Sequence, residues 1–246
     1  MKGINSNVIC LVFSGTKDKK GEAIYQDILV KTQKEFHTFD VEVIFLSDKA
    51  SFVEIVKGFD EKYHKTFIQP VFVCNFETYD RIAAQLHGGK IVFGEQVINS
   101  ADDFPSLLPL FQKDISMAQR WGCGIVYFVH GGRNNILTEQ LDRFVNEKFP
   151  YSRCYFGLIH GKPGIKEVLS RIKGDKIQKV LLKPFMFTDG YHVNTEFDLI
   201  NKDSFFFQLK SMLKEVIPIR EVLGENDIFL KLIFDKINKK IQEFRL

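Results

Sequence analysis

Short, continuously apolar runs alternate with amphipathic helical patterns along the whole chain. Residues 7–13, for example, form an apolar run, and residues 21–36 follow with the periodicity of a helix. Strands that are apolar at every position are buried on both faces, which is typical of parallel sheets covered by helices. The chain is therefore predicted to be an α/β protein. The expected strands span residues 7–13, 41–46, 66–74, 90–98, 124–129, 154–159, 177–187 and 217–223.

The second half of the sequence resembles the first. Residues 67–79 (FIQPVFVCNFETY) match residues 181–193 (LLKPFMFTDGYHV), with Pro70 and Pro184 in corresponding places. A repeat of this kind predicts two similar Rossmann-like lobes, each a four-stranded parallel sheet with helices on both faces. We place the N-terminal lobe at residues 1–118 and the C-terminal lobe at residues 119–246.

Composition restricts the classes of protein to which this chain belongs. It has 246 residues, a net charge of +3, 45% hydrophobic and 26% charged residues, which is typical of a soluble globular protein. This small charge gives no support for a nucleic-acid partner, and no apolar run is long enough to span a membrane. The four cysteines are far apart, which favours a reducing compartment. We therefore expect a cytoplasmic protein without nucleic-acid or membrane partners.

Three histidines follow three successive predicted strands of the C-terminal lobe. His130 ends IVYFVHGG, His160 ends CYFGLIHG, and His192 follows LLKPFMFTDG. The carboxyl ends of parallel strands open into the ligand crevice of such a sheet, so these imidazoles are expected to form one cluster for a metal ion or a proton. The corresponding positions of the N-terminal lobe hold Ser14, Leu46 and Asn75.

Several segments carry a family resemblance. FSGT follows the first strand, HGG the fifth, KPFMFTDGYHVNTEF the seventh, and VLGEN closes the pattern. Together with the QP-V-F and ETYDRI segments of the first lobe, they resemble the class II chelatases, and more closely the anaerobic sirohydrochlorin cobaltochelatase family of cobalamin biosynthesis. The likeness extends from Val8 to about Ile237.

This resemblance implies that the protein inserts a divalent ion into sirohydrochlorin or a related tetrapyrrole and releases two pyrrole protons. It implies that His130 and His192 are catalytic residues and metal ligands. His160 stands where the family has a glutamate, and Asn75-Phe76-Glu77 stands where glycine-rich sequence is usual. These departures motivate an alternative, a non-catalytic tetrapyrrole- or metal-binding protein with the chelatase fold.

The chemistry of the three imidazoles indicates which metal they would hold. His130, His160 and His192 together leave coordination positions open, which suits an ion that must be passed on to a macrocycle. Imidazole suits cobalt, nickel, zinc or Fe(II) better than magnesium or calcium. Ligand type alone does not choose among these ions. Cobalt is the metal substrate that the family resemblance implies, with iron and nickel as alternatives, and no organic cofactor is expected.

The tetrapyrrole would bring peripheral carboxylates and a flat apolar face to the site. We expect Arg133, Tyr191 and Lys17 to bind this substrate, Arg133 first because a guanidinium can hold a carboxylate through two hydrogen bonds. Lys162 and Lys183 are further candidates at strand ends. Three carboxylates are expected to assist proton removal if they line the cleft: Asp189, Glu196 and Glu77. The oligomeric state stays open, with a homo-oligomer as one option.

Overall fold

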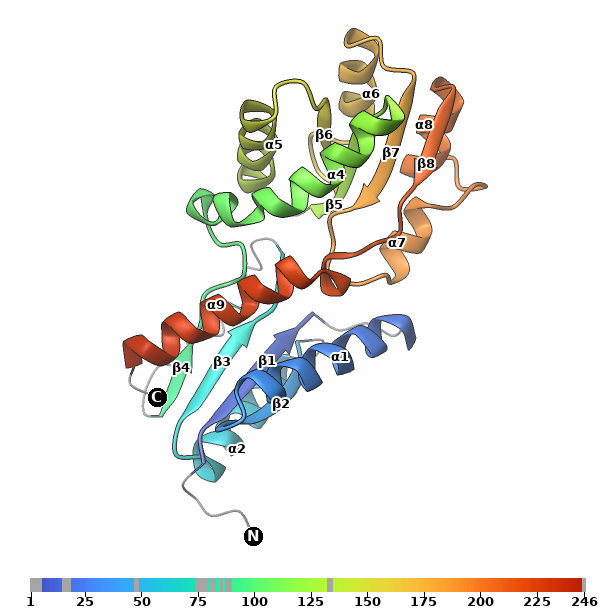
Figure 1. The fold of residues 1–246 in the computed structure, drawn as a ribbon. Coiled ribbons are helices and arrows are strands. Elements are labelled where there is room, and N and C mark those ends of the chain that lie inside the picture. The colour runs from blue at the N-terminus through green and yellow to red at the C-terminus, as the bar shows by residue number, and fades with distance from the viewer. Residues whose placement is uncertain are drawn as a thin grey trace. The chain divides into compact units, whose positions relative to one another are not determined.

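The computed structural model describes residues 6–14, 19–46, 49–73, 79, 83, 84, 86, 90–131 and 135–244. The described strands form two separate four-stranded parallel sheets (Figure 1). The strands are β1 (Val8–Phe13), β2 (Asp40–Phe45), β3 (Thr66–Pro70), β4 (Ile91–Phe93), β5 (Gly124–Gly131), β6 (Cys154–His160), β7 (Lys179–Pro184) and β8 (Glu215–Pro218). The α-helices are α1 (Lys19–Glu35), α2 (Lys49–Lys62), α4 (Leu108–Trp121), α5 (Ile136–Lys148), α6 (Ile165–Gly174), α7 (Tyr191–Glu196), α8 (Phe205–Met212) and α9 (Asp227–Phe244). Two short 3-10 helices, η1 (Ala101–Leu107) and η2 (Leu223–Glu225), complete the set.

The two sheets have the same strand order. The first runs β2-β1-β3-β4 and the second β6-β5-β7-β8, so each is built in the same way from its own four strands. Pro70 and Pro184 end the third strand of each sheet, opposite Val12 and Phe128 of the central strands. In both sheets the residue after the proline donates its N–H to that partner's carbonyl, at 2.8 and 2.9 Å. The predicted duplication of a four-stranded α/β unit is confirmed.

The central strands are buried because helices cover both faces of the sheets. In the second sheet, the Phe111 ring of α4 packs against Tyr127 and Phe185 on one face. On the opposite face, Phe128 contacts Phe205 of α8 at 5.8 Å between ring centroids. Every residue of β1 in the first sheet is likewise buried. The continuous apolar runs of the sequence therefore correspond to strands that have helices on both sides.

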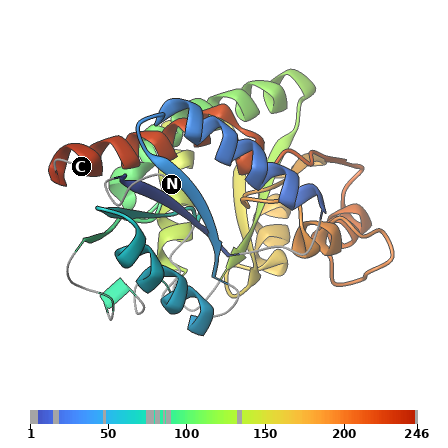
Figure 2. The ribbon, with the colours of Figure 1, turned by 90° about the horizontal axis from the view of Figure 1, so that it is seen from below.

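The compact units of the chain differ from the predicted lobes of residues 1–118 and 119–246. One unit contains residues 22–99 and 230–246 together with β1, and the other contains residues 100–229 with 18–21. Helix α4 precedes the predicted boundary but packs on the second sheet through Phe111. Most of α9 belongs with the first sheet, beside which it lies in both views (Figures 1 and 2), and its Phe234 contacts Phe36. Sequence order alone could not assign these helices, because their apolar faces determine which sheet they cover.

Two further expectations from the sequence concern cysteines and membrane spans. Cys10 and Cys154 are buried, Cys123 is half-buried, and these three thiols are free, whereas Cys74 lies outside the described residues. Among the helices that the structure describes, none combines the length and apolar character that a bilayer crossing requires.

Candidate metal centre

His130 stands at the carboxyl end of the central strand of the second sheet, one residue before the end of β5. The strand continues into Gly131, whose φ of +82° lies in the left-handed region that favours glycine. A Cβ atom built on Gly131 would lie 2.1 Å from the carbonyl oxygen of His160. A side chain cannot fit there, so Gly131 lets the ends of β5 and β6 approach closely.

His160 is the last residue of β6 and is paired in register with Gly131. Gly161 follows it with a φ of +129°, and a Cβ atom on this glycine would lie 2.5 Å from the Asn135 amide. The glycines after His130 and His160 therefore have a structural role, because each allows a close approach beside an imidazole, of the His160 backbone at Gly131 and of the Asn135 side chain at Gly161. As a result, His130 and His160 face the same open end of the sheet.

His192 comes from a different kind of element than the sequence suggested. The apolar run was expected to continue as a strand to residue 187 and an irregular stretch to follow, but β7 ends at Pro184 and His192 is the second residue of the short helix α7. The ring is half-buried, whereas those of His130 and His160 are exposed. A helix instead of a strand end brings the third imidazole over the crevice.

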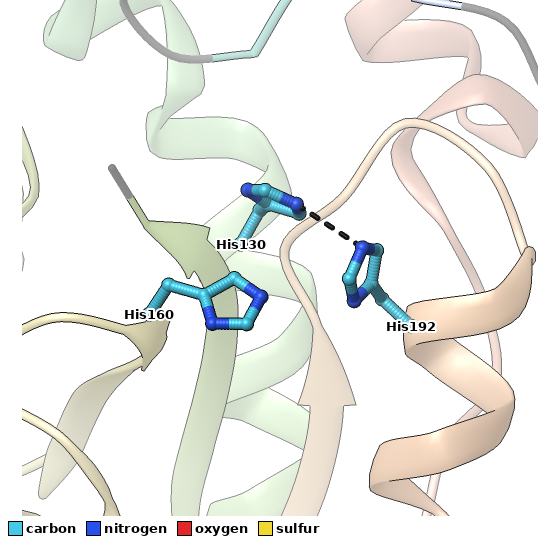
Figure 3. A group of neighbouring side chains, drawn as sticks. All are labelled: His130, His160 and His192. Atoms are coloured by element: carbon cyan, nitrogen blue, oxygen red, sulfur yellow. Dashed lines mark hydrogen bonds between the residues drawn. The ribbon is translucent and has the colours of Figure 1, made fainter. Parts of the chain in front are cut away.

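The three imidazoles meet at one point, as the sequence predicted (Figure 3). Nε2 of His130 lies 3.2 Å from Nε2 of His192, and one ligand atom from each of the three rings lies within 4.8 Å of the others. Two nitrogens bound to one ion at about 2.0–2.1 Å with tetrahedral geometry are about 3.3 Å apart. His130 and His192 are thus spaced as two nitrogens that share one ion would be, and a ligand atom of His160 lies within 4.8 Å of both.

A hydrogen bond orients one of these rings, and burial lowers the pKa of another. Nδ1 of His130 lies 3.0 Å from the carbonyl oxygen of Gly131, and since a carbonyl only accepts, Nδ1 carries the proton and donates. Nε2 of neutral His130 then keeps its lone pair, which is the common second-shell arrangement of metal-ligating histidines. Burial, followed by the charges of His130 and His160, lowers the pKa of His192 and favours the neutral form that can bind a metal.

The predicted substrate-binding residues differ in where the structure places them. Tyr191 is 77% exposed and its ring lies 5.4 Å from that of His192, so it presents an aromatic surface beside the imidazoles. Lys162 is exposed close to His160 in the chain. Arg133 and Lys17, together with Asn75 and Glu77, lie outside the described residues.

Lys183 does not meet the expectation that it could bind a peripheral carboxylate. Its side chain is 4% exposed, and its ammonium group lies 2.8 Å from Asp114 and 3.0 Å from Glu221. The hydroxyl of Tyr127 also donates to Asp114, at 2.9 Å. This lysine is the centre of a buried ion cluster between α4, β7 and the segment after β8, and its charge is neutralised by the two carboxylates of this cluster.

The two described carboxylates proposed to assist proton removal are both buried. Glu196 is buried and accepts a hydrogen bond from the N–H of Phe205 at 2.9 Å, and burial raises its pKa. Asp189 is also buried, with one oxygen 2.5 Å from the Lys20 ammonium group. Among the described residues, the imidazoles are therefore the strongest candidates for accepting protons at this end of the sheet.

The structure also reveals a contact that sequence reasoning missed. Arg220, two residues after β8, donates a hydrogen bond to the Asn194 side chain of α7 at 2.7 Å. Its guanidinium lies over the Phe197 ring, 5.1 Å from the centroid. A single arginine after a strand gives no signal in a sequence, because its partner lies 26 positions away and is recognisable only in three dimensions.

Comparison with known proteins places this centre in a wider context. The family model described as cobalt chelatase (CbiK) matches residues 9–242. No curated protein sequence matches significantly. Among solved structures, SirB from Bacillus subtilis with Fe3+ is similar with a TM-score of 0.65 and 15% identity, over 95% of each chain. CbiX, described as the terminal enzyme of siroheme biosynthesis in denitrifying bacteria, is similar with a TM-score of 0.60 and 16% identity, over 95% of this chain and 98% of that one. DR2241 from Deinococcus radiodurans, a multi-domain protein similar to chelatases, has a TM-score of 0.63 and 11% identity, over 95% of this chain and 54% of that one.

Proposed function

The chain belongs to the cobalt chelatase family, which acts by inserting a metal ion into a tetrapyrrole, and from this premise we propose that its substrates are a divalent ion, cobalt first, and sirohydrochlorin or a related tetrapyrrole. The observation that carries the proposal is the meeting of His130, His160 and His192 at the open end of the second sheet. Iron and nickel remain the alternatives to cobalt, because imidazole binds all three.

The proposed role of the three imidazoles is to hold the incoming ion. Three neutral nitrogen ligands leave at least one coordination position open, through which the macrocycle nitrogens can reach the metal. Two of the rings are exposed, so the ion can arrive from solvent and leave towards the tetrapyrrole. A closed four-ligand cage would retain the metal instead.

We further propose that His130 and His192 accept the pyrrole protons. Each metal–nitrogen bond formed with the macrocycle displaces a proton from a pyrrole nitrogen, and each imidazole that releases the metal regains a lone pair. One nitrogen cannot hold metal and proton together, so proton acceptance follows metal release at that ring. Tyr191 is proposed to contact the macrocycle face, and Arg133 and Lys17 its peripheral carboxylates.

An anaerobic insertion assay with sirohydrochlorin and Co²⁺, Fe²⁺ or Ni²⁺ tests the proposal. His130→Ala and His192→Ala should each lower the insertion rate by at least about 100-fold, the lower end for removing an acid–base group. His64→Ala is the matched control, since His64 is also exposed but lies in the first unit. A wild-type rate in either site variant would refute the assignment. A wild-type protein that shifts the tetrapyrrole spectrum or retains metal without turnover would instead be the non-catalytic binder.

His160→Glu tests the third ligand. A carboxylate adds a negative charge that neutralises the bound ion further and helps proton removal, so this variant should bind Co²⁺ more tightly and insert it faster. If the variant and the wild type bind and insert metal identically, residue 160 is not part of the site.

A further inference from the structure

Helix α7 carries His192 but is too short to hold its own position. It has six residues, whereas isolated helices are marginal in water below about 12–15 residues. Where the imidazole points therefore depends on contacts that α7 makes with the rest of the second unit. Some of these contacts are internal to the core: Val193 is buried and Glu196 accepts from the N–H of Phe205.

Arg220 holds the outer side of the same helix. Asn194, its hydrogen-bond partner, is two positions after His192, and two residues correspond to about 200° around an α-helix. The two side chains therefore leave α7 on nearly opposite sides. A fixed point at Asn194 limits rotation of the helix about its axis, and this rotation would move the imidazole of His192 away from that of His130.

The guanidinium of Arg220 also connects α7 to the strand that carries His130. It lies over Phe197, the residue after α7, and Phe197 packs edge-on against Phe128 at 5.3 Å between ring centroids. Phe128 is two residues before His130 in β5. One side chain thus contacts the helix of one proposed ligand and the aromatic pair that joins this helix to the strand of the other.

The backbone at Arg220 is itself anchored on both sides. The N–H of Ile219 donates to the carbonyl of Leu182 at 2.9 Å. Glu221 is paired with Lys183 at 3.0 Å and with Lys113 at 2.8 Å. Arg220 therefore projects from a segment fixed by β7 and the buried ion cluster, which makes it a firm support and not a mobile surface charge.

We propose that Arg220, acting through Asn194 and Phe197, is a positioning residue that sets the orientation of His192 for metal binding. The inference rests on the proposed metal-binding role of His192. Arg220 is exposed, so its removal leaves the core of the second unit intact. Its loss changes the geometry of the site and not the stability of the fold.

The experiment is an anaerobic titration of the full chain with Co²⁺, followed by the visible absorption of the bound ion, alongside urea unfolding of each variant. Arg220→Ala should weaken Co²⁺ binding about tenfold, the lower end of the range for residues that orient metal ligands. Arg220→Lys should be intermediate, because an ammonium group cannot stack flat on Phe197 and bond Asn194 like a guanidinium. Lys179→Ala is the matched control, removing an exposed, paired cation from the amino end of the same sheet.

Asn194→Ala separates positioning from helix stability. Alanine has a higher helix propensity than asparagine, so a role in stabilising α7 alone predicts unchanged or tighter Co²⁺ binding. The positioning role predicts weaker binding, and a loss in the Arg220→Ala/Asn194→Ala double variant that is smaller than the sum of the two single losses, because both variants break the contact between Arg220 and Asn194.

The outcomes are distinguishable from those that test the proposed function. If His192→Ala abolishes the Co²⁺ spectrum while Arg220→Ala and Asn194→Ala titrate like Lys179→Ala, the positioning role is wrong and the metal site stands. If His192→Ala titrates like the wild type, the proposed metal site is wrong, and the positioning role is wrong with it.

Discussion

Gly131→Ala is the substitution that tests most directly how the fold builds the metal centre. Its Cβ atom would lie 2.1 Å from the oxygen and 2.9 Å from the carbon of the His160 carbonyl. Both obstacles are backbone atoms, which cannot rotate away. The ends of β5 and β6 must therefore separate by about 1 Å to reach ordinary contact distance.

The size of the effect follows from this geometry. An alanine at a φ of +82° costs roughly 1–2 kcal/mol, and forcing extra volume into a packed contact costs roughly 1–3 kcal/mol more. We expect the free energy of unfolding to fall by about 2–5 kcal/mol. Because His130 and His160 lie on the two strand ends that move, a misplacement of about 1 Å should lower the rate of metal insertion about 100-fold.

Two glycine variants of the same unit serve as controls in urea unfolding and in the insertion assay. A Cβ atom on Gly157 would lie 2.6 Å from the Phe205 ring, within the core, so Gly157→Ala should lose roughly 1–3 kcal/mol of stability but insert metal normally while folded. Gly174 has no atom within 4 Å of its Cβ position, so Gly174→Ala should be neutral or up to about 1 kcal/mol more stable. If Gly131→Ala inserts metal at the wild-type rate under conditions where it is folded, close approach of the strand ends does not position the imidazoles.

The remaining predictions concern the ion cluster and the metal. Burial alone would raise the pKa of Glu221, but hydrogen bonds from Lys113 and Lys183 outweigh it and hold the pKa at about 2, below the usual 4.5. The resulting stabilisation is complete above about pH 4.5 and is lost as the pH falls towards 2. In Glu221→Gln, the free energy of unfolding in urea should therefore fall by about 1–2 kcal/mol less than in the wild type between these two pH values. An unchanged pH profile would contradict this. Lys183→Met should cost about 3–5 kcal/mol in thermal or urea unfolding, because it leaves the Asp114 carboxylate buried without its cationic partner. Adding Asp114→Asn should recover part of the loss, because it removes the unpaired charge while its amide oxygen can still accept from the Tyr127 hydroxyl. Co²⁺ at 100 times its Kd should raise the free energy of unfolding by about 2.7 kcal/mol in wild type and by much less in His130→Ala; equal stabilisation would place the ion elsewhere.

The fold could be predicted from the sequence because its strongest signals are periodic. Apolar runs identified seven of the eight described strands, whereas the run at 217–223 overlaps β8 (Glu215–Pro218) only at its first two residues. The paired prolines Pro70 and Pro184 revealed the duplication that the common strand order confirms. Strand ends were less accurate. β7 was expected to reach residue 187 but ends at Pro184. Phe185 still donates to the carbonyl of Phe128, but the carbonyls of Met186 and Phe187 accept from Leu223 and Gly224 after β8, outside the regular ladder.

The meeting of His130 and His160 could be predicted for a topological reason. Adjacent parallel strands end at the same edge of a sheet, so two residues at those ends must be neighbours once the strands pair. His192 was placed in the same cluster through the order of motifs, although the element that carries it is a helix. The orientation of that helix depends on Arg220 and Phe197, contacts that no local pattern encodes.

Lys183 shows where local reasoning is misleading. A lysine near the carboxyl end of a strand could bind an anion in the crevice or lie within the core, and the sequence around it is the same in either case. Its environment is decided by Asp114, 69 positions earlier, and by Glu221, 38 positions later. A buried charge requires such partners, but the sequence does not show which carboxylates supply them.

The two sheets of this chain separate what topology provides from what side chains provide. Both have the same strand order, so both have an open edge beyond the carboxyl ends of their central strands. In the first sheet the positions that correspond to His130 and His160 hold Ser14 and Leu46, and Leu46 is buried with its N–H donating to the carbonyl of Phe13 at 2.8 Å. In the second sheet the corresponding region carries His130 and His160, brought together by Gly131. A serine hydroxyl and a leucine side chain do not offer the nitrogen ligands that imidazoles do, so the proposed metal chemistry follows from the side chains of the second sheet and not from the duplicated fold.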